Sequence, residues 1–180
     1  MTHGKGIVTV WHRRIGGLVG IGLVLSMVLV RPAAAQGESG IAVGSAAPVV
    51  TVHDLDGKSV DLGSYIGKQP VVLEWWATWC ELCEAMLPRV KAAHATYGDR
   101  VAFVGINVTV NQTPARVRKY LAEHRPPFHT LYDDRGTSIR AYSVPSTSFI
   151  AIVSREGKVV YTGTGAEQDL DSALRQVTAR

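Results

Sequence analysis

The 180-residue sequence is poor in the residues from which metal centres and disulfide scaffolds are built. It contains only two cysteines, Cys80 and Cys83, and has no second C-x-x-C pair or H-x-H partner. A structural zinc site needs four such ligands, so that class of site is excluded. Residue Glu84 also excludes the C-x-x-C-H motif of c-type haem attachment. A purely structural disulfide is disfavoured, because a loop this short constrains the unfolded chain little.

The sequence after residue 35 also has no excess of positive or negative charge. The sequence has 19 basic and 15 acidic residues, and residues 1–35 hold four of the basic residues and no acidic one. Without that segment 15 of each sign remain. A surface for binding nucleic acid is therefore not predicted. The remaining length of about 145 residues is typical of one domain with its own core.

The first 35 residues have the three parts of a secretory signal. A basic start precedes an uncharged apolar run at residues 15–30, and Ala33-Ala34-Ala35 offers a cleavage site. We predict cleavage after Ala35. The alternative is an uncleaved membrane anchor, although the run of 16 residues is shorter than the roughly 20 that a spanning helix needs. Both interpretations place the chain in the periplasm or another extracytoplasmic compartment, where disulfides form.

The rest of the chain reads as a small, polar, flexible lead-in at residues 36–46 and one domain at residues 47–180. Two apolar stretches within residues 47–62 flank the dipeptide Asp-Gly, which predicts a β-hairpin. Further along, apolar runs predict strands and 3.6-residue periodicity with capping residues predicts helices. The predicted strands cover 71–76, 101–108, 128–132, 147–153 and 158–162, and the predicted helices cover 80–97, 114–124, 137–142 and 170–177.

This order of elements predicts the fold class. Two strand–helix–strand crossovers favour parallel strands, and the final hairpin adds an antiparallel edge. We therefore expect an α/β sandwich with a mixed central sheet.

The two thiols are placed for disulfide exchange. Cys80 is predicted at the start of a helix, where unpaired N–H groups and a partial positive charge favour thiolate over thiol. A thiolate is the species that attacks a disulfide. Cys83 lies one helical turn further on, within reach and more shielded. The pair is thus suited to act as an attacking and a resolving sulfur.

The residues also allow two other chemistries to be considered for the cysteine pair, metal transport and peroxide reduction. A copper metallochaperone would use Cys80, Cys83 and the distant His129 as ligands. A peroxidase whose reactive thiol is Cys80 would need a proline and a hydroxyl residue at positions that hold Leu73 and Ala77, so it is discounted. The copper alternative remains open from the residues alone.

The motif W-A-T-W-C-E-L-C, followed by Pro88, resembles the active-site motif of thioredoxins. The upstream A-P-V-V-T-V-H-D-L-D-G-K-S-V-D-L and the extra helix near 114–124 are similar to the exported TlpA-like branch, within the redoxin group. That branch includes disulfide reductases of cytochrome c maturation. The resemblance covers about residues 41–178. It implies a thioredoxin fold with an N-terminal β-hairpin and one inserted helix, no cofactor, and exchange with protein disulfides.

The resemblance also implies roles for single residues. Cys80 matches the nucleophile and Cys83 the resolving thiol. Pro145, after Val144, matches the cis-proline that presents backbone to an extended substrate. Glu74, six residues before Cys80, matches a buried acid. Burial should raise its pKa and let it exchange a proton with Cys83.

Three positions near the cysteines differ from the family pattern, and one neighbouring tryptophan has an expected role of its own. Glu81-Leu82 separates the cysteines where thioredoxin has Gly-Pro. Met86 stands where some cytochrome-maturation reductases carry an acid. Trp79, next to Cys80, is expected to shield the disulfide and to contact partner proteins.

The leading hypothesis is a monomeric, exported thiol–disulfide oxidoreductase that works as a reductant in the cell envelope. Its substrates would be protein disulfides, such as those of apocytochromes or of proteins that assemble copper sites. A reductant in an oxidising compartment needs electrons, so a membrane-bound donor is implied. The opposite direction, oxidation of partners, remains open from the sequence.

Overall fold

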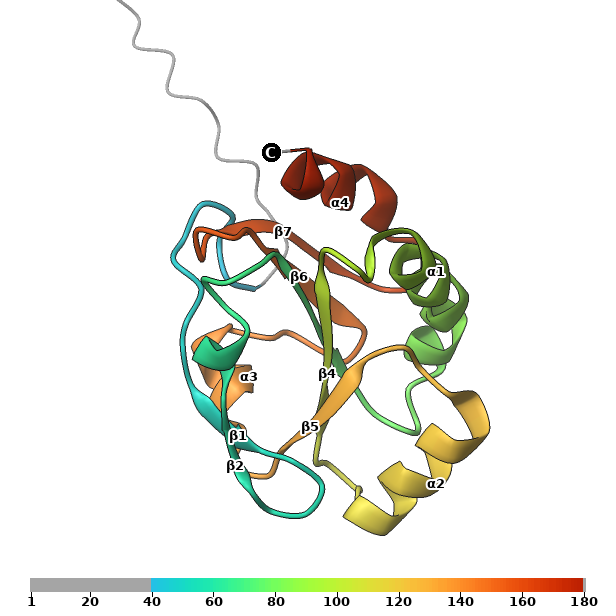
Figure 1. Ribbon diagram of the computed structural model, residues 1–180. Helices are drawn as coiled ribbons and strands as arrows, with labels where there is room; N and C mark the ends of the chain where they lie inside the picture. Colours follow the sequence, from blue (N-terminus) through green and yellow to red (C-terminus); the bar gives the residue numbers. More distant parts are fainter. Residues whose placement is uncertain (1–39, 180) are drawn as a thin grey trace, which may run out of the picture. The chain divides into compact units, whose positions relative to one another are not determined.

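The computed structural model describes residues 40–179, which contain a seven-stranded mixed sheet (Figure 1). The strand order is β2-β1-β5-β4-β3-β6-β7. The strands are β1 (Thr51–His53), β2 (Ser59–Asp61), β3 (Val71–Trp76), β4 (Ala102–Val108), β5 (His129–Asp133), β6 (Phe149–Val153) and β7 (Val159–Thr164). The helices are α1 (Glu81–Tyr97), α2 (Pro114–His124), α3 (Thr137–Ala141) and α4 (Leu170–Thr178), with a 3₁₀ turn η1 at Leu62–Ser64.

The sheet is parallel in its middle and antiparallel towards both edges. β3, β4 and β5 are parallel neighbours, as the two crossovers predict, and β6 and β7 continue the sheet in antiparallel pairing. The N-terminal hairpin also forms as predicted. It joins the other side of the sheet, where His53 of β1 pairs with Tyr132 of β5. The expected mixed α/β fold is confirmed.

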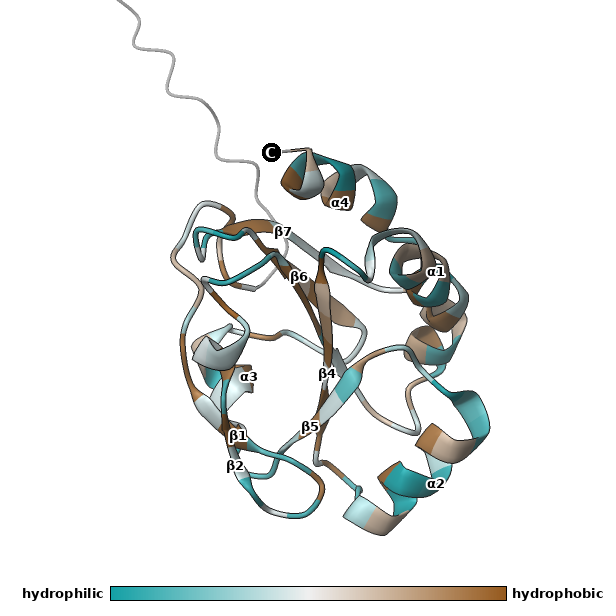
Figure 2. Ribbon diagram, viewed as in Figure 1, coloured by the Kyte–Doolittle hydropathy of each residue, from teal (hydrophilic) through white to brown (hydrophobic). Residues whose placement is uncertain are grey.

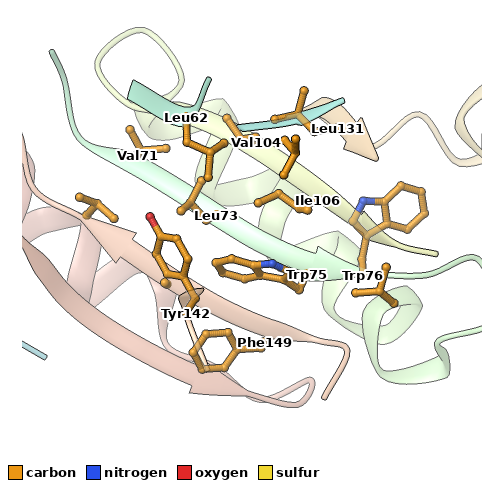
Figure 3. Packing of buried hydrophobic residues seen from close by; sticks show 14 of the residues in the cluster. Leu62, Val71, Leu73, Trp75, Trp76, Val104, Ile106, Leu131, Tyr142 and Phe149 are labelled. Carbon is orange, nitrogen blue, oxygen red and sulfur yellow. The ribbon is translucent and has the colours of Figure 1, made fainter. Parts of the chain in front are cut away.

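Strand β3 is the central element that leads to the cysteines. All six of its residues are buried, which explains why its sequence is a nearly continuous apolar run. Trp75 lies against the rings of Tyr142 and Phe149, with centroids 4.9 and 5.6 Å apart, and its Nε1 donates to Ser138 Oγ at 2.9 Å (Figure 3). Each large side chain buried in this way contributes about 1.5–3 kcal/mol to folding.

Helices cover both faces of the sheet. α1 and α4 pack together on one face, where Met86 and Leu174 join Ile150 of β6 in a shared apolar cluster. Helix α3 lies on the other face (Figure 1). Figure 2 shows central strands that are hydrophobic along their length, whereas the helices alternate hydrophobic and hydrophilic residues. Helix α1 continues through Pro88.

The start of the described chain is part of the sheet's edge. Residues 36–46 were predicted as a flexible lead-in, and the described part of that segment forms backbone hydrogen bonds with the chain at the start of β7. Gly44 N–H donates to Val159 O at 2.8 Å, and Val159 N–H donates to Ser45 O at 2.9 Å. The bonds form because β7 is otherwise an edge strand with free backbone groups. The predicted signal at residues 1–35 lies outside the described residues.

Within residues 40–179 no helix has the length and apolar character needed to cross a bilayer.

Candidate active site

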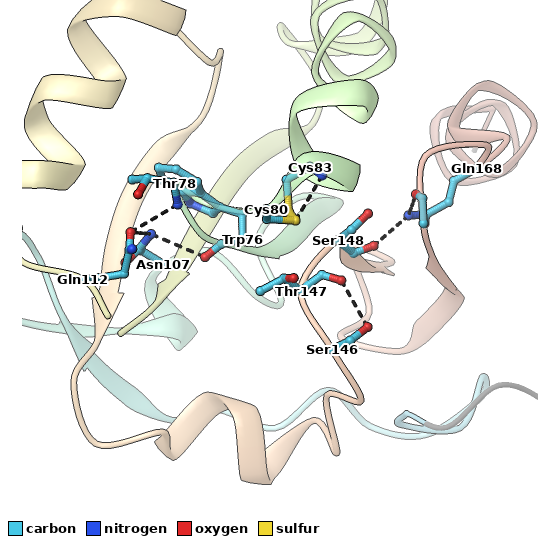
Figure 4. The surroundings of a disulfide bond; sticks show 11 residues. Trp76, Thr78, Cys80, Cys83, Asn107, Gln112, Ser146, Thr147, Ser148 and Gln168 are labelled. Carbon is cyan, nitrogen blue, oxygen red and sulfur yellow. Dashed lines mark hydrogen bonds between the residues drawn. A yellow bond between two sulfur atoms is a disulfide. The ribbon is translucent and has the colours of Figure 1, made fainter. Parts of the chain in front are cut away.

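Cys80 and Cys83 form a disulfide at the N-terminus of α1, directly after the segment that follows β3 (Figure 4). Their Cα atoms are 5.2 Å apart. Cys80 is the N-cap residue, and its Sγ accepts a hydrogen bond from the Cys83 N–H at 3.1 Å. The two cysteines are 7% and 5% exposed, so the oxidised form shields them almost equally, which differs from the expected asymmetry.

The helix terminus and two carboxylates act on this sulfur in opposite directions. The N-terminus of α1 favours a negative sulfur at Cys80. Glu81 and Glu84, both exposed in the first turn of α1, disfavour it. Glu84 also lies 3.9 Å from His124 Nε2 at the end of α2. The thiolate at Cys80 is therefore stabilised less than it would be at a helix start without acids.

Glu74 is buried in the centre of the sheet. Its side chain belongs to a residue only 4% exposed, and its Oε2 has no hydrogen-bond partner among the described residues. Removal from water raises the pKa of its carboxyl to about 8. The prediction that Glu74 is a buried acid is consistent with this geometry.

Aromatic side chains pack beside the residue that is paired with Glu74 in the sheet. The partner of Glu74 in the β3–β4 register is Gly105, and the ring of Phe128 fills the space where a side chain at position 105 would lie. Trp76 packs on Phe128 and on Tyr120, with ring centroids 5.5 and 5.2 Å apart. Burial, and then the charges of Glu84 and Glu74, raise the pKa of Tyr120. The glycine in a buried strand was the available sequence signal for this close packing.

Trp79 lies at the rim of the site. Its side chain is exposed, and its Nε1 donates to the carbonyl oxygen of Val110 at 2.8 Å. Val110 and Leu82 are also large, exposed hydrophobic residues. That Trp79 contacts partner proteins stays a prediction, and the exposed Val110 in the loop between β4 and α2 is a further candidate for the same contact.

The loop before β6 differs from the resemblance. A cis bond between Val144 and Pro145 was expected, but no peptide bond in the described residues is cis. Ser143 and Ser148 instead turn the chain with φ values of 49° and 62°, so the loop does not need a cis bond to reverse direction. Trans is also the lower-energy form of an X-Pro bond by about 0.5–1 kcal/mol. Figure 4 shows Ser146, Thr147 and Ser148 in the surroundings of the disulfide.

His129 does not join the cysteines. It is exposed at the start of β5, where its nearest aromatic neighbour is Tyr65 at a ring distance of 6.2 Å. Residues 40–179 contain no group of three His, Cys, Asp or Glu side chains that could hold a metal ion. The ligand set of the copper alternative is not assembled.

The sequence did not predict a role for three buried polar side chains near the disulfide, those of Asn107, Gln112 and Gln168. They hold backbone groups of the loops beside the disulfide. Neither periodicity nor a motif marks such residues, because their partners are distant in sequence.

The disulfide joins two cysteines separated by two residues, and it lies at the start of a helix that follows a central strand of a mixed sheet. This arrangement is typical of thiol–disulfide oxidoreductases with the thioredoxin fold. The Redoxin family model matches residues 42–177, and the chain belongs to this family.

Known proteins agree with this class. The chain is 27% identical to the thiol-disulfide oxidoreductase ResA of Bacillus thuringiensis subsp. konkukian over 143 residues, which are 78% of this chain and 82% of that protein. The thioredoxin domain of a thiol-disulfide oxidoreductase from Bacteroides vulgatus superimposes with a TM-score of 0.67 at 22% identity, and the match covers 77% and 99% of the two chains. It supports the fold.

A third comparison is a secreted disulfide oxidoreductase of Mycobacterium tuberculosis, which is homologous to DsbE of E. coli. It has a TM-score of 0.61 and 25% identity, and the match covers 73% of this chain and 96% of that one. The chain is thus a thiol–disulfide oxidoreductase.

Proposed function

We propose that this oxidoreductase is exported and reduces protein disulfides in the cell envelope, with Cys80 as the attacking and Cys83 as the resolving thiol. The observation that carries the assignment is the position of Cys80 at the N-cap of α1, where its sulfur accepts the Cys83 N–H. A sulfur in this place is the better thiolate of the two. Trp79, Val144 and Pro145 would border the bound polypeptide.

The exchange runs in two balanced steps. The Cys80 thiolate attacks one sulfur of the partner's disulfide, which forms a mixed disulfide and releases the other partner sulfur as a thiolate. Cys83 then loses its proton and attacks Cys80 Sγ. The Cys80–Cys83 disulfide forms, and the second partner sulfur leaves as a thiolate. Two electrons pass to the partner, and its two thiolates take up protons.

Glu74 would accept the proton of Cys83 in the second step, directly or through one water. Its burial in an apolar environment supports this role, because a carboxyl whose pKa is about 8 is close to balance near neutral pH. A general base works best when its pKa lies near the working pH. An ordinary carboxylate would be a much weaker base.

The electrostatics of the site support the direction of transfer. Strong oxidants are oxidising because their reduced form is stabilised, chiefly as a thiolate. Here Glu81 and Glu84 oppose a thiolate at Cys80. This favours a reductant, and a reductant outside the cytoplasm needs a membrane-bound electron donor. Apocytochromes and proteins of copper-site assembly are the candidate substrates.

Export is supported by the secreted relative of Mycobacterium tuberculosis and by the signal-like residues 1–35. Mass spectrometry of envelope fractions tests it, with a mature N-terminus at Gln36 as the expected result. A chain that retains residues 15–30 would point to a membrane anchor.

The reduction potential of the Cys80–Cys83 pair tests the direction. Equilibration with glutathione at a series of ratios, followed by quantification of both forms, gives the value. We expect a potential close to the roughly −270 mV of thioredoxin. A potential near the roughly −120 mV of DsbA would mean that the protein oxidises its partners instead.

A further inference from the structure

Two buried glutamines flank the disulfide. Gln112, in the loop between β4 and α2, is 9% exposed, and Gln168, before α4, is 6% exposed. Figure 4 shows them on opposite sides of the cysteines, each joined by dashed hydrogen bonds to a different loop. A buried amide is costly unless its donors and its acceptor are satisfied, so the partners of each amide are informative.

Gln112 holds the segment that leads to Cys80. Its Oε1 accepts from the backbone N–H of Thr78 at 3.1 Å and from Asn107 Nδ2 at 3.4 Å. Its Nε2 donates to Asn111 O at 2.9 Å. The same Asn107 amide donates to the carbonyl oxygen of Trp76 at 3.4 Å. Asn107 and Gln112 therefore hold the carbonyl of Trp76 and the N–H of Thr78, the backbone groups on either side of residue 77. The oxygen of Gln112 joins the two contacts, because it accepts from both Thr78 and Asn107.

Gln168 holds the opposite loop and acts through its nitrogen. Its Nε2 donates to Ser148 O at 3.0 Å and to Gly165 O at 2.8 Å, and its Oε1 accepts from Tyr161 Oη at 3.2 Å. Ser148 has a φ of 62°, a left-handed conformation that is unfavourable for a serine. Its hydroxyl is buried and has no partner among the described residues. Two backbone bonds also hold this turn, from Ser148 N–H to Trp75 O at 2.8 Å and from Gly165 N–H to Ser148 O at 3.1 Å, and Gln168 supplies its side-chain contact.

We propose that Gln112 and Gln168 are positioning residues for thiol–disulfide exchange. Gln112 fixes the loop that carries Cys80, and Gln168 fixes the Ser146–Ser148 loop against which an incoming polypeptide is held. The inference rests on the proposed function of the two cysteines. It follows from geometry, because an attacking sulfur must lie in line with the disulfide that it cleaves, and a displacement of about 1 Å is costly in rate.

The two roles predict different kinetic effects. A small disulfide needs only a correctly placed Cys80, whereas a polypeptide also needs the Ser146–Ser148 loop. Gln112→Met should therefore slow the reaction with both kinds of substrate by about fivefold or more. Gln168→Met should slow the reaction with a polypeptide by a similar factor and affect the small disulfide less. Gln176→Met, at an exposed glutamine of α4, is the matched control.

The experiment uses reduced protein and two probes, 5,5′-dithiobis(2-nitrobenzoate) and a peptide with a single intrachain cystine. Second-order rate constants with both probes are measured by stopped flow, and thermal melting is recorded in parallel. The main readout is the ratio of the two rate constants. Both constants are proportional to the fraction of Cys80 that is ionised, so a change in that fraction does not alter the ratio.

Glutamate substitutions separate positioning from stability. Gln112→Glu loses the nitrogen that donates to Asn111 O but keeps the oxygen that accepts from Thr78, so its rate ratio and its rate with ionised Cys80 should stay close to the wild-type values. Gln168→Glu loses the nitrogen that donates to Ser148, so its ratio should fall by about fivefold. Both changes add the same charge, and each therefore controls for the charge of the other.

The outcomes are distinct. Lower melting temperatures with wild-type rates and ratios in both methionine variants would show a purely structural role and overturn the inference. If the methionine variants do not fold, the glutamate pair decides, and equal ratios in both would overturn it. A wild-type protein that reduces neither probe would instead overturn the proposed function.

Discussion

Glu74 and Gly105 are direct partners in the parallel register of β3 and β4, and the ring of Phe128 occupies the side-chain space that Gly105 leaves empty. Glu74 therefore has a residue without a side chain as its register neighbour, and its Oε2 has no hydrogen-bond partner among the described residues to offset its burial. Under the proposed mechanism, its protonation would affect both the stability of the fold and the exchange chemistry of the cysteines. Three of the predictions below follow from this pair of residues.

Stability should fall as pH rises through the titration range of Glu74. The folded pKa of about 8 lies above the ordinary value of 4.5, so between these values the folded chain keeps a proton that the unfolded chain has released. The contribution is complete below about pH 4.5 and is lost by about pH 8, with a slope of up to about 1.4 kcal/mol per pH unit. Glu74→Gln should remove this slope. Urea unfolding at several pH values measures it, with exposed Glu123→Gln as control. Equal slopes in wild type and Glu74→Gln would contradict the burial.

Glu74→Gln should also slow resolution of the mixed disulfide more than its formation. The variant keeps the shape of the side chain but cannot accept the proton of Cys83. We expect a loss of about tenfold or more in the second step at neutral pH, and a smaller loss at alkaline pH where hydroxide competes. Stopped-flow reduction of a model protein disulfide resolves the two steps. Identical pH profiles for both proteins would exclude a proton-transfer role.

Cys83→Ala should accumulate mixed disulfides between Cys80 and partner proteins. Without a resolving thiol the first covalent product cannot proceed, so the adduct should persist on non-reducing gels and disappear with dithiothreitol. The matched variant Cys80→Ala should trap few adducts, since Cys83 lies inside the first turn of α1. Equal trapping by the two variants would reverse the assignment of attacker and resolver.

Gly105→Ala should destabilise the protein by about 1–3 kcal/mol, because the new methyl group meets the Phe128 ring. Phe128→Ala removes the ring and should cost stability by itself. In the double variant the clash is absent, so the two losses should not add. Chemical denaturation of both single variants and the double variant gives the coupling. Additive losses would mean that Phe128 does not rest on Gly105.

The sequence specified the strands and helices well because their patterns are local. The run at β3 is apolar because both faces of that strand are buried, and Asp-Gly marks the turn of the first hairpin. Pairing of that hairpin with β5 could not be predicted, since β1 and β5 are far apart in sequence and carry no complementary signal.

Within the site, the spacing of the two cysteines marked them as a redox pair, and Glu74 was proposed because it matches a buried acid of the family that the chain resembles. Gln112 and Gln168 were not found, because a buried glutamine in a loop looks the same in sequence as an exposed one. The geometry at Pro145 was inferred from resemblance, and the resemblance was misleading there because Ser143 and Ser148 supply the turn.

The backbone contacts between residues 44–47 and β7 have a consequence for self-association. β7 closes one side of the sheet, and residues 44–47 bond to its first residue and to the turn before it: Gly44 and Ser45 pair with Val159, and Ala47 donates to Gly157 O. A second molecule that tried to extend the sheet by adding its own strand there would first have to displace this segment. A chain trimmed to begin at Pro48 would lose that cover. The start of its β7 would then be an exposed edge that can pair with a strand of another molecule and so lead to aggregation.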